Sequence, residues 1–338
     1  MVNGAGSAGH HHGELLQGAL QWAGEVVSCL ITLPVGGVGS SARYIAKGAL
    51  GASAPDVVLG ATSEFGAAAT DKGGSAAACP AGLVEVVPAW KRKAARAAEL
   101  ALDFIRAPVG GRLEMECSVA TGVGLGSSTC DVVAAIRAVC GAYCVEVGAA
   151  DVARLAVEAE GAADPIMFDG EMVLFAQRRG RVLESFGSWV PPYVVLSIDT
   201  DPGGPGVDTL SLPAPRYTEA DLDAFENMVG RARLAFQLRD PAALAAIATE
   251  SAALNQRFLP LRYFPEICDF AAEYRALGVQ ISHSGTVAGI LFDARPGVGP
   301  GSAVIDEVTA RVRSLGALPR GLLRSGVDDR LTVQGIRV

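Results

Sequence analysis

A glycine-rich segment at residues 121–129 has the residue types that bind phosphate. It reads TGVGLGSST and lies between an expected strand and an expected helix. Glycines let the backbone turn sharply and bring N–H groups close to an anion. The serines and the threonine can cap the helix, whose first turn offers unpaired donors and a positive dipole end. We therefore predict that phosphate is bound by Gly122, Gly124, Leu125, Gly126, Ser127, Ser128 and Thr129.

Three other interpretations of this loop make different demands. A Walker A loop needs a lysine before the Ser or Thr, and no lysine precedes Ser127. A dinucleotide-binding turn needs G-x-G-x-x-G, whereas the glycines here stand at 122, 124 and 126. Glu146 is placed like a ribose-binding acid, but its segment CVEV is a poor strand. A plain glycine-rich turn with serine caps and no ligand remains the third alternative.

A second candidate group is the carboxylates of the segment VEAEGAADP, which are Glu158, Glu160 and Asp164. Phosphoryl transfer from ATP needs Mg²⁺ to neutralise the phosphates and usually a group that accepts the proton of the attacking hydroxyl. This segment offers both kinds of group. Pro165 keeps Asp164 out of the helical region, which suits a residue at a helix end. The alternative is a solvated helix face followed by a turn-forming aspartate.

Three segments together resemble the motifs of the GHMP kinase superfamily, which includes galactokinase, homoserine kinase and mevalonate kinase. The loop GVGLGSS resembles its nucleotide-binding motif. Residues 9–18, GHHHGELLQG, resemble the first motif, and their GELLQG core is most similar to the branch containing the L-threonine kinases of cobalamin synthesis. Residues 282–289, SHSGTVAG, resemble the third motif, a small-residue loop that closes over the phosphates.

The resemblance implies an α+β protein with the two-domain GHMP kinase fold. Residues 1–187 would form an ATP-binding domain similar to ribosomal protein S5 domain 2, and residues 188–338 a ferredoxin-like domain. The implied cofactors are ATP and Mg²⁺. Ser128 and Glu160 would hold the magnesium ion, with Glu158 as the rival carboxylate, and Asp164 would be the catalytic base.

The resemblance also assigns residues outside the central loop. Phosphate binding would extend to Ser284, Gly285 and Thr286. The substrate would be bound by His12, Glu14, Gln17, Asp208 and Thr209. For Asp208 and Thr209, a plain loop with turn-forming residues is an equal alternative. The threonine kinases carry a Pro-Ala-Ser-Cys-like run where this chain has three histidines at 10–12, and this difference leaves the substrate open. Adjacent histidines cannot all point at one ion, so a structural metal there is disfavoured.

Two further patterns are weaker. The run SHSG at 282–285 lacks the first glycine of the G-x-S-x-G nucleophile elbow, so a serine hydrolase is not expected. The basic triplet Lys91-Arg92-Lys93 is expected to begin a surface helix rather than to clamp a phosphate.

The elements that must position these residues follow from hydrophobic periodicity. Short strands are expected within 13–35, and strands alternating with loops from 36 to 80. Helices are expected at 91–106, 129–144 and 151–160, a strand at 112–120 and a hairpin at 171–186. The second half should contain a strand at 193–199, helices near 218–238, 241–257 and 264–277, one strand at 279–292 and a final helix–strand pair.

Composition excludes several classes of protein. The 338 residues are 50% hydrophobic with a net charge of −8, which fits a folded protein and argues against nucleic acid as a partner. No apolar run is long enough for a membrane span, and the first residues lack the features of a signal peptide. Seven scattered cysteines without a C-x-x-C pair favour a reducing, cytoplasmic location.

We expect an ATP-dependent kinase that phosphorylates a small hydroxy amino acid, with L-threonine as the first candidate. Homoserine, serine or a specialised amino alcohol are alternative acceptors. A catalytically silent nucleotide-binding regulator with the same fold is the main alternative of another class, and a decarboxylating relative of mevalonate kinase is a third. The sequence does not identify the oligomeric state, for which a homodimer is one option.

Overall fold

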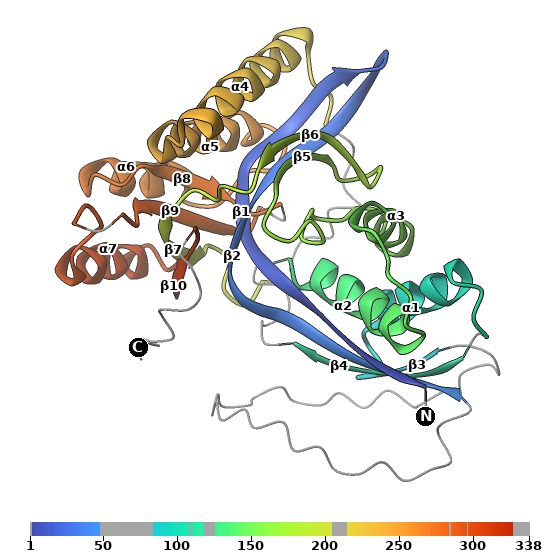
Figure 1. Ribbon diagram of the computed structural model, residues 1–338. Helices are drawn as coiled ribbons and strands as arrows, with labels where there is room; N and C mark the ends of the chain where they lie inside the picture. The colour runs from blue at the N-terminus through green and yellow to red at the C-terminus, as the bar shows by residue number, and fades with distance from the viewer. Residues whose placement is uncertain are drawn as a thin grey trace.

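The computed structural model describes residues 2–47, 84–108, 110–117, 126–204, 215–283, 285–295 and 297–326. Two long antiparallel strands, β1 (Asn3–Trp22) and β2 (Glu25–Ala46), run through both halves of the molecule (Figure 1). The expectation of short strands within 13–35 is therefore wrong, because both strands of this hairpin are long. Of the segment 36–80, expected to alternate strands with loops, residues 48–80 lie outside the described residues. Small residues such as Gly4 and Gly6 have little strand propensity, but a Cβ on either would clash with the backbone of the helix packed above. Close packing against this helix therefore requires glycine at both positions.

The first half of the chain places three helices on one face of the sheet (Figure 1). These are α1 (Arg92–Phe104), α2 (Ser127–Ala142) and α3 (Ala149–Glu160). The strand β4 (Gly111–Cys117) pairs with β2, and β3 (Val84–Val87) pairs with β4 in parallel. The three helices lie where they were expected, and α2 supplies a large share of the buried core from Cys130 to Cys140.

The second half contains a four-stranded antiparallel sheet in the order β10-β7-β9-β8. Its strands are β7 (Tyr193–Asp199), β8 (Gly278–Ile281), β9 (Val287–Asp293) and β10 (Leu318–Arg324). This order is that of a ferredoxin-like domain, as expected. The single strand predicted at 279–292 is wrong, because β8 and β9 are two antiparallel strands separated by the turn at 282–286. Apolar residues on both sides of that turn hid the break.

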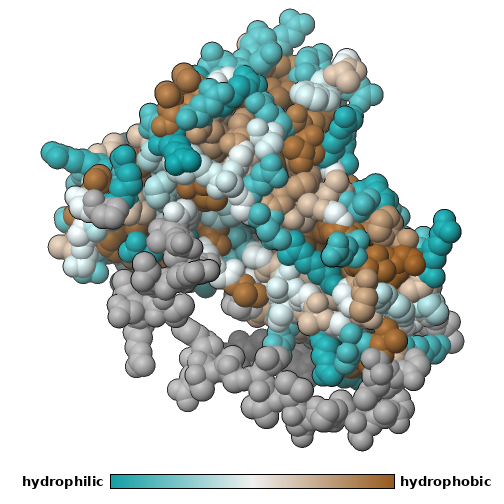
Figure 2. Space-filling view, viewed as in Figure 1, coloured by the Kyte–Doolittle hydropathy of each residue, from teal (hydrophilic) through white to brown (hydrophobic). Residues whose placement is uncertain are grey.

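The helices of the second half are α4 (Glu219–Leu238), α5 (Pro241–Asn255), α6 (Phe264–Glu273) and α7 (Ser302–Ser314). Helices α4 and α5 also pack on β1. Thr218 and Asp221 form a capping box at the start of α4, and Asp240 caps α5 before Pro241. None of the helices in the described ranges is long and apolar enough to cross a membrane. The visible surface mixes hydrophilic residues with smaller hydrophobic patches (Figure 2).

The two halves are joined through β1, which pairs with β8 between Glu14 and Ile281. The hairpin of β5 (Met172–Ala176) and β6 (Arg181–Gly187) lies against β2. One hydrophobic cluster combines Leu15 and Leu16 of β1 with Phe225 of α4 and Tyr193 of β7. Because the core is shared in this way, the domain boundary near residue 187 stays a prediction.

Candidate active site

The beginning of α2 offers backbone donors to an anion. Gly126 precedes the helix with a left-handed backbone (φ 66°), and no side chain caps the helix start. A helix leaves its first N–H groups without intrahelical partners, and its dipole makes this end positive. Ser127 and Ser128 are half-buried in the first turn. Gly122, Gly124 and Leu125 lie outside the described residues.

The position of His11 on β1 also requires glycine at residue 126. A Cβ placed on it would lie 2.1 Å from Nε2 of His11, so only glycine fits here. The phosphate loop and the first motif are therefore in direct contact.

Glu160 ends α3 and points at the start of α2. Its Oε2 accepts a hydrogen bond from the Ser128 hydroxyl at 2.6 Å, and its Oε1 accepts one from the Thr129 hydroxyl at 2.7 Å. Burial raises the pKa of Glu160 to about 7, although both hydrogen bonds oppose the shift. Glu158 faces the solvent with 51% of its side chain exposed. Of the two glutamates, the structure brings only Glu160 to the predicted site.

Asp164 lies in the loop after α3 and pairs with His11. Nε2 of His11 donates to Oδ2 of Asp164 at 2.9 Å, and the Asp164 backbone N–H donates to the Thr129 hydroxyl at 3.3 Å. Burial disfavours both charges, but the attraction between the two groups outweighs it. The pKa of Asp164 is lowered and that of His11 is raised. The pair is therefore ionic.

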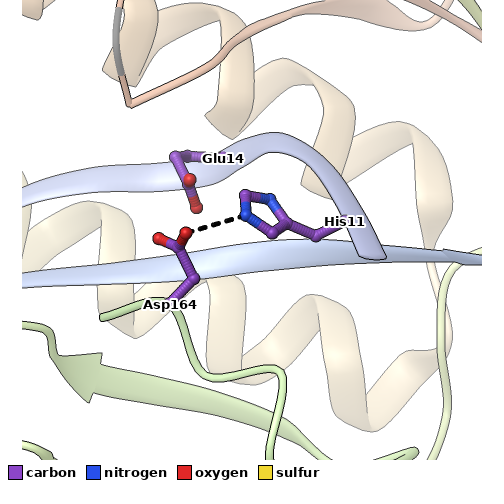
Figure 3. A group of neighbouring side chains, drawn as sticks. All are labelled: His11, Glu14 and Asp164. Atoms are coloured by element: carbon purple, nitrogen blue, oxygen red, sulfur yellow. Dashed lines mark hydrogen bonds and ion pairs between the residues drawn. The ribbon is translucent and has the colours of Figure 1, made fainter. Parts of the chain in front are cut away.

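Glu14 completes a buried cluster with these two residues. Figure 3 shows the side chains of His11, Glu14 and Asp164 directed toward one another. The Thr32 hydroxyl donates to Oε2 of Glu14 at 2.7 Å. Burial raises the pKa of Glu14 to about 8. Glu14 was predicted as a substrate ligand, and the structure places it beside the predicted base.

His12, predicted as a substrate ligand, lies on the opposite side of the strand from His11. His12 is fully buried; the Gln280 amide donates to its Nδ1 at 2.9 Å, and its Nε2 is 2.9 Å from the Ser197 hydroxyl. Its burial lowers its pKa to about 3. The structure therefore does not bring His12 to the other site residues, and the residue that sequence reasoning missed is His11.

A bulge explains why His11 and Glu14 share a side. In a regular strand, residues three apart point to opposite faces. The pairing of β1 with β2 is shifted between His11 and Glu14, and Gly13 between them has φ 60°. This irregularity turns Glu14 toward His11. The glycine at position 13 was the only signal in the sequence.

The third motif meets the first through its histidine. The Gln17 amide donates to Nδ1 of His283 at 3.1 Å, which brings the predicted substrate ligand Gln17 beside the 282–286 turn. Gly285 has φ 69° and lies against Leu259, and the Thr286 carbonyl accepts two hydrogen bonds from Thr200. Ser284, Asp208 and Thr209 lie outside the described residues.

Two of the cavities that adjoin these groups are lined by lysine or arginine residues. One of about 410 Å³ is lined by Gln17, His283 and the arginines Arg178, Arg216 and Arg257. Arg257 pairs with Asp221, whereas no carboxylate of the described residues pairs with Arg178 or Arg216. This cavity therefore presents positive charge beside the first and third motifs.

The second cavity, of about 110 Å³, lies at the start of α2. It is lined by Ser127, Ser128, Trp90, Lys91 and Lys93 among others. Lys91 was expected at the surface, but it is buried and forms an ion pair with Asp131 of α2. The sequence did not show this pair because its members are 40 residues apart.

Comparisons with known proteins identify a related family and related folds. Residues 89–169 match the family described as GHMP kinases N terminal domain. No curated protein sequence matches the chain significantly. The homoserine kinase from Cytophaga hutchinsonii has a TM-score of 0.61 at 15% identity, with 97% of this chain and 95% of that chain covered. Galactokinase from Lactococcus lactis, complexed with galactose, has a TM-score of 0.62 at 11% identity, covering 96% and 94%.

A third solved structure, mevalonate kinase from Methanococcus jannaschii, has a TM-score of 0.55 at 11% identity and covers 96% of this chain and 98% of that chain. Similarities at this level of identity establish a shared fold. The family match covers the segment that contains Ser128, Glu160 and Asp164. Residues 89–169 therefore match the GHMP kinase N-terminal domain, and the chain as a whole shares the fold of these kinases.

Proposed function

We propose that this protein is an ATP-dependent kinase that phosphorylates the hydroxyl of a small hydroxy amino acid, with L-threonine as the first candidate. The observation that carries the proposal is the meeting of Ser128, Glu160 and Asp164 at the start of α2. An anion-binding helix end, a carboxylate with hydroxyl neighbours and a second, ionised carboxylate are the groups that phosphoryl transfer requires. A catalytically silent nucleotide-binding regulator would not need the ionised carboxylate.

The nucleotide would lie at the smaller cavity. Its phosphates would accept hydrogen bonds from the first turn of α2, and Lys93 is close enough to Glu160 to lower that residue's pKa. Ser128 and Glu160 offer only oxygen atoms, the donors that Mg²⁺ prefers. They are the residues that would hold the ion, which neutralises phosphate charge when bound.

Asp164 would accept the proton of the acceptor hydroxyl. A base must be ionised before it can accept a proton, and the ion pair with His11 keeps Asp164 in this form. After transfer, the proton on Asp164 would be released with the product. His11 stays a positioning residue in this scheme, because it fixes the carboxylate without contacting the hydroxyl.

The larger cavity supports an acceptor that carries a carboxylate. Arg178 and Arg216 have guanidinium groups to bind it, and planar guanidinium groups match carboxylates geometrically. Gln17 and His283 line the same cavity, and the His283 ring interacts electrostatically with Asp164. An amino acid bound by its carboxylate among the arginines could therefore direct its hydroxyl toward Asp164.

The test is release of ADP by the purified full chain with MgATP and a panel of acceptors. The panel contains L-threonine, L-serine, L-homoserine and L-threoninol, in which the carboxylate of threonine is reduced. We expect the highest kcat/KM with L-threonine and the lowest with L-threoninol. Preference for L-homoserine or for the amino alcohol would support the alternative acceptors. Tight ATP binding without turnover of any hydroxy compound would indicate the regulator. We place the activity in the cytoplasm, where ATP and Mg²⁺ are plentiful.

A further inference from the structure

The buried cluster of His11, Glu14 and Asp164 has more acceptor atoms than the proposed reaction uses. One ligand atom from each residue lies within 4.8 Å of the other two, and the three groups converge (Figure 3). His11 and Glu14 are only 2% and 3% exposed. The cluster is therefore not a solvated acidic patch, and its charges must be balanced inside the protein.

The cluster has a deficit of positive charge. Two carboxylates face a single imidazole, so a proton on His11 balances only one of them. A divalent cation would balance both carboxylates at once and leave His11 neutral, as a metal ligand must be.

Glu14 has an oxygen atom available for this purpose. Its Oε2 accepts the hydrogen bond from Thr32, but its buried Oε1 has no partner within the described part of the chain. Thr32 fixes the orientation of the carboxylate, as an outer-shell partner of a metal ligand does. An unpartnered, buried carboxylate oxygen is costly, and a bound cation would remove that cost.

We propose that His11, Glu14 and Asp164 bind a divalent transition-metal ion of the zinc class, and that this ion inhibits the enzyme. One imidazole nitrogen with two carboxylates suits zinc, cobalt or manganese, whereas magnesium prefers oxygen donors alone. The all-oxygen pair of Ser128 and Glu160 therefore differs in metal preference from this cluster. The two sites are neighbours, because the Thr129 hydroxyl contacts both Glu160 and Asp164.

The ion would replace the proton that His11 donates to Asp164. Zinc bonds of about 2.0–2.2 Å hold tetrahedral ligands roughly 3.4 Å apart. His11 Nε2 and Asp164 Oδ2, now 2.9 Å apart, would have to separate by about half an ångström, and ligand atoms up to 4.8 Å apart would have to approach each other. Nδ1 of His11 has no acceptor among the described residues. Without that outer-shell partner we expect affinity about 10- to 100-fold below that of fully supported sites. Asp164 bound to the ion could not accept a proton; this inhibitory consequence rests on the proposed function, whereas the binding does not.

The experiment uses Co²⁺ as an optical probe of the chelator-treated, desalted full chain. We expect one Co²⁺ per chain with visible d–d bands and displacement by Zn²⁺. A thiolate ligand would add a strong near-ultraviolet charge-transfer band, so the seven cysteines are distinguished from this site. His11→Gln and Glu14→Gln should lose the stoichiometric signal. His10→Gln is the matched control, because it changes the neighbouring histidine, and it should keep the signal.

Absence of stoichiometric Co²⁺ binding in the wild type, or its persistence in both cluster variants, would overturn the site. Loss in His10→Gln would do the same. Thermal melting of each metal-free variant shows whether it is folded. If His11→Gln does not fold, Co²⁺ binding by Glu14→Gln is the test of the site. In the wild type, Zn²⁺ added at saturating MgATP should reduce ADP release. Unaltered turnover with the ion bound would overturn the inhibition, while absence of turnover with normal Co²⁺ binding would contradict only the proposed function.

Discussion

Glu160 and Asp164 are four residues apart and both are largely buried, yet their surroundings differ. Glu160 accepts hydrogen bonds from two neutral hydroxyls, and its pKa rises to about 7. Asp164 also suffers from burial, but the neighbouring His11 carries a charge, and the pKa of Asp164 is lowered. A hydroxyl donor compensates burial only in part, whereas a charged donor overcompensates it.

This difference in pKa suits the two carboxylates to different chemical roles. Asp164 is ionised without any ligand and is ready to accept a proton. Burial brings the pKa of Glu160 to about 7, and an arriving cation would favour its charged form. Burial is common to the two carboxylates, and the charge of the nearest donor distinguishes them.

Replacing the base should have the largest effect. Asp164→Asn keeps the shape of the side chain but cannot accept a proton, so kcat for ADP release should fall by roughly 10²-fold or more. The KM for ATP should change little, because nucleotide binding is assigned to α2. Steady-state kinetics measure both constants, and Asp151→Asn on the surface of α3 is the control. Near-normal turnover would mean that the proton leaves without a base.

Glu160→Gln should change the response to magnesium. It removes the charge that would face the ion, and we expect the Mg²⁺ concentration for half-maximal rate to rise by about tenfold or more. Glu158→Gln, on the exposed side of the same helix, should leave this concentration unchanged. Magnesium titrations at fixed ATP compare the two variants. A shift in Glu158→Gln alone would transfer the metal role to Glu158.

His11→Gln should move the pH dependence of kcat. In the wild type the charge of His11 keeps Asp164 ionised below its ordinary pKa. Without that charge only the weaker effects of His283 and Thr129 oppose burial, so the acid limb of the kcat profile should move to higher pH by about 1–3 units. His11→Lys, which restores a positive charge, should reverse part of the shift. An acid limb that is identical in all three proteins would show that another group sets it.

The smallest effect is expected at the exposed wall of the larger cavity. Arg216→Ala should raise the KM for L-threonine by about two- to fivefold, as expected for an exposed ion pair. The KM for L-threoninol, which has no carboxylate, should stay the same, and so should that for ATP. Kinetics with both acceptors make this comparison. An equal rise for L-threoninol would argue against carboxylate recognition by Arg216.

Much of the fold could be read from local patterns. The helices α1 to α5 lie within a few residues of their expected ranges. In α1 the polar residues recur at helical spacing, whereas α5 is rich in alanine, which has the highest helix propensity. The split of 279–292 into β8 and β9 was missed because both strands are apolar on either side of a short polar turn. The length of β1 was missed because its small residues are selected by packing on α2.

The sequence by itself determined that a glycine-rich turn precedes a helix and that Glu160 and Asp164 follow at the end of another. These are short-range features, fixed by propensity and spacing. Only the tertiary structure decided that His11 rather than His12 meets Asp164, that Glu14 joins them, and that Lys91 is buried against Asp131. The bulge at Gly13 sets which way three neighbouring side chains point. Such an irregularity depends on pairing with a strand and on packing against helices far away in the chain, and a local pattern of residues contains neither.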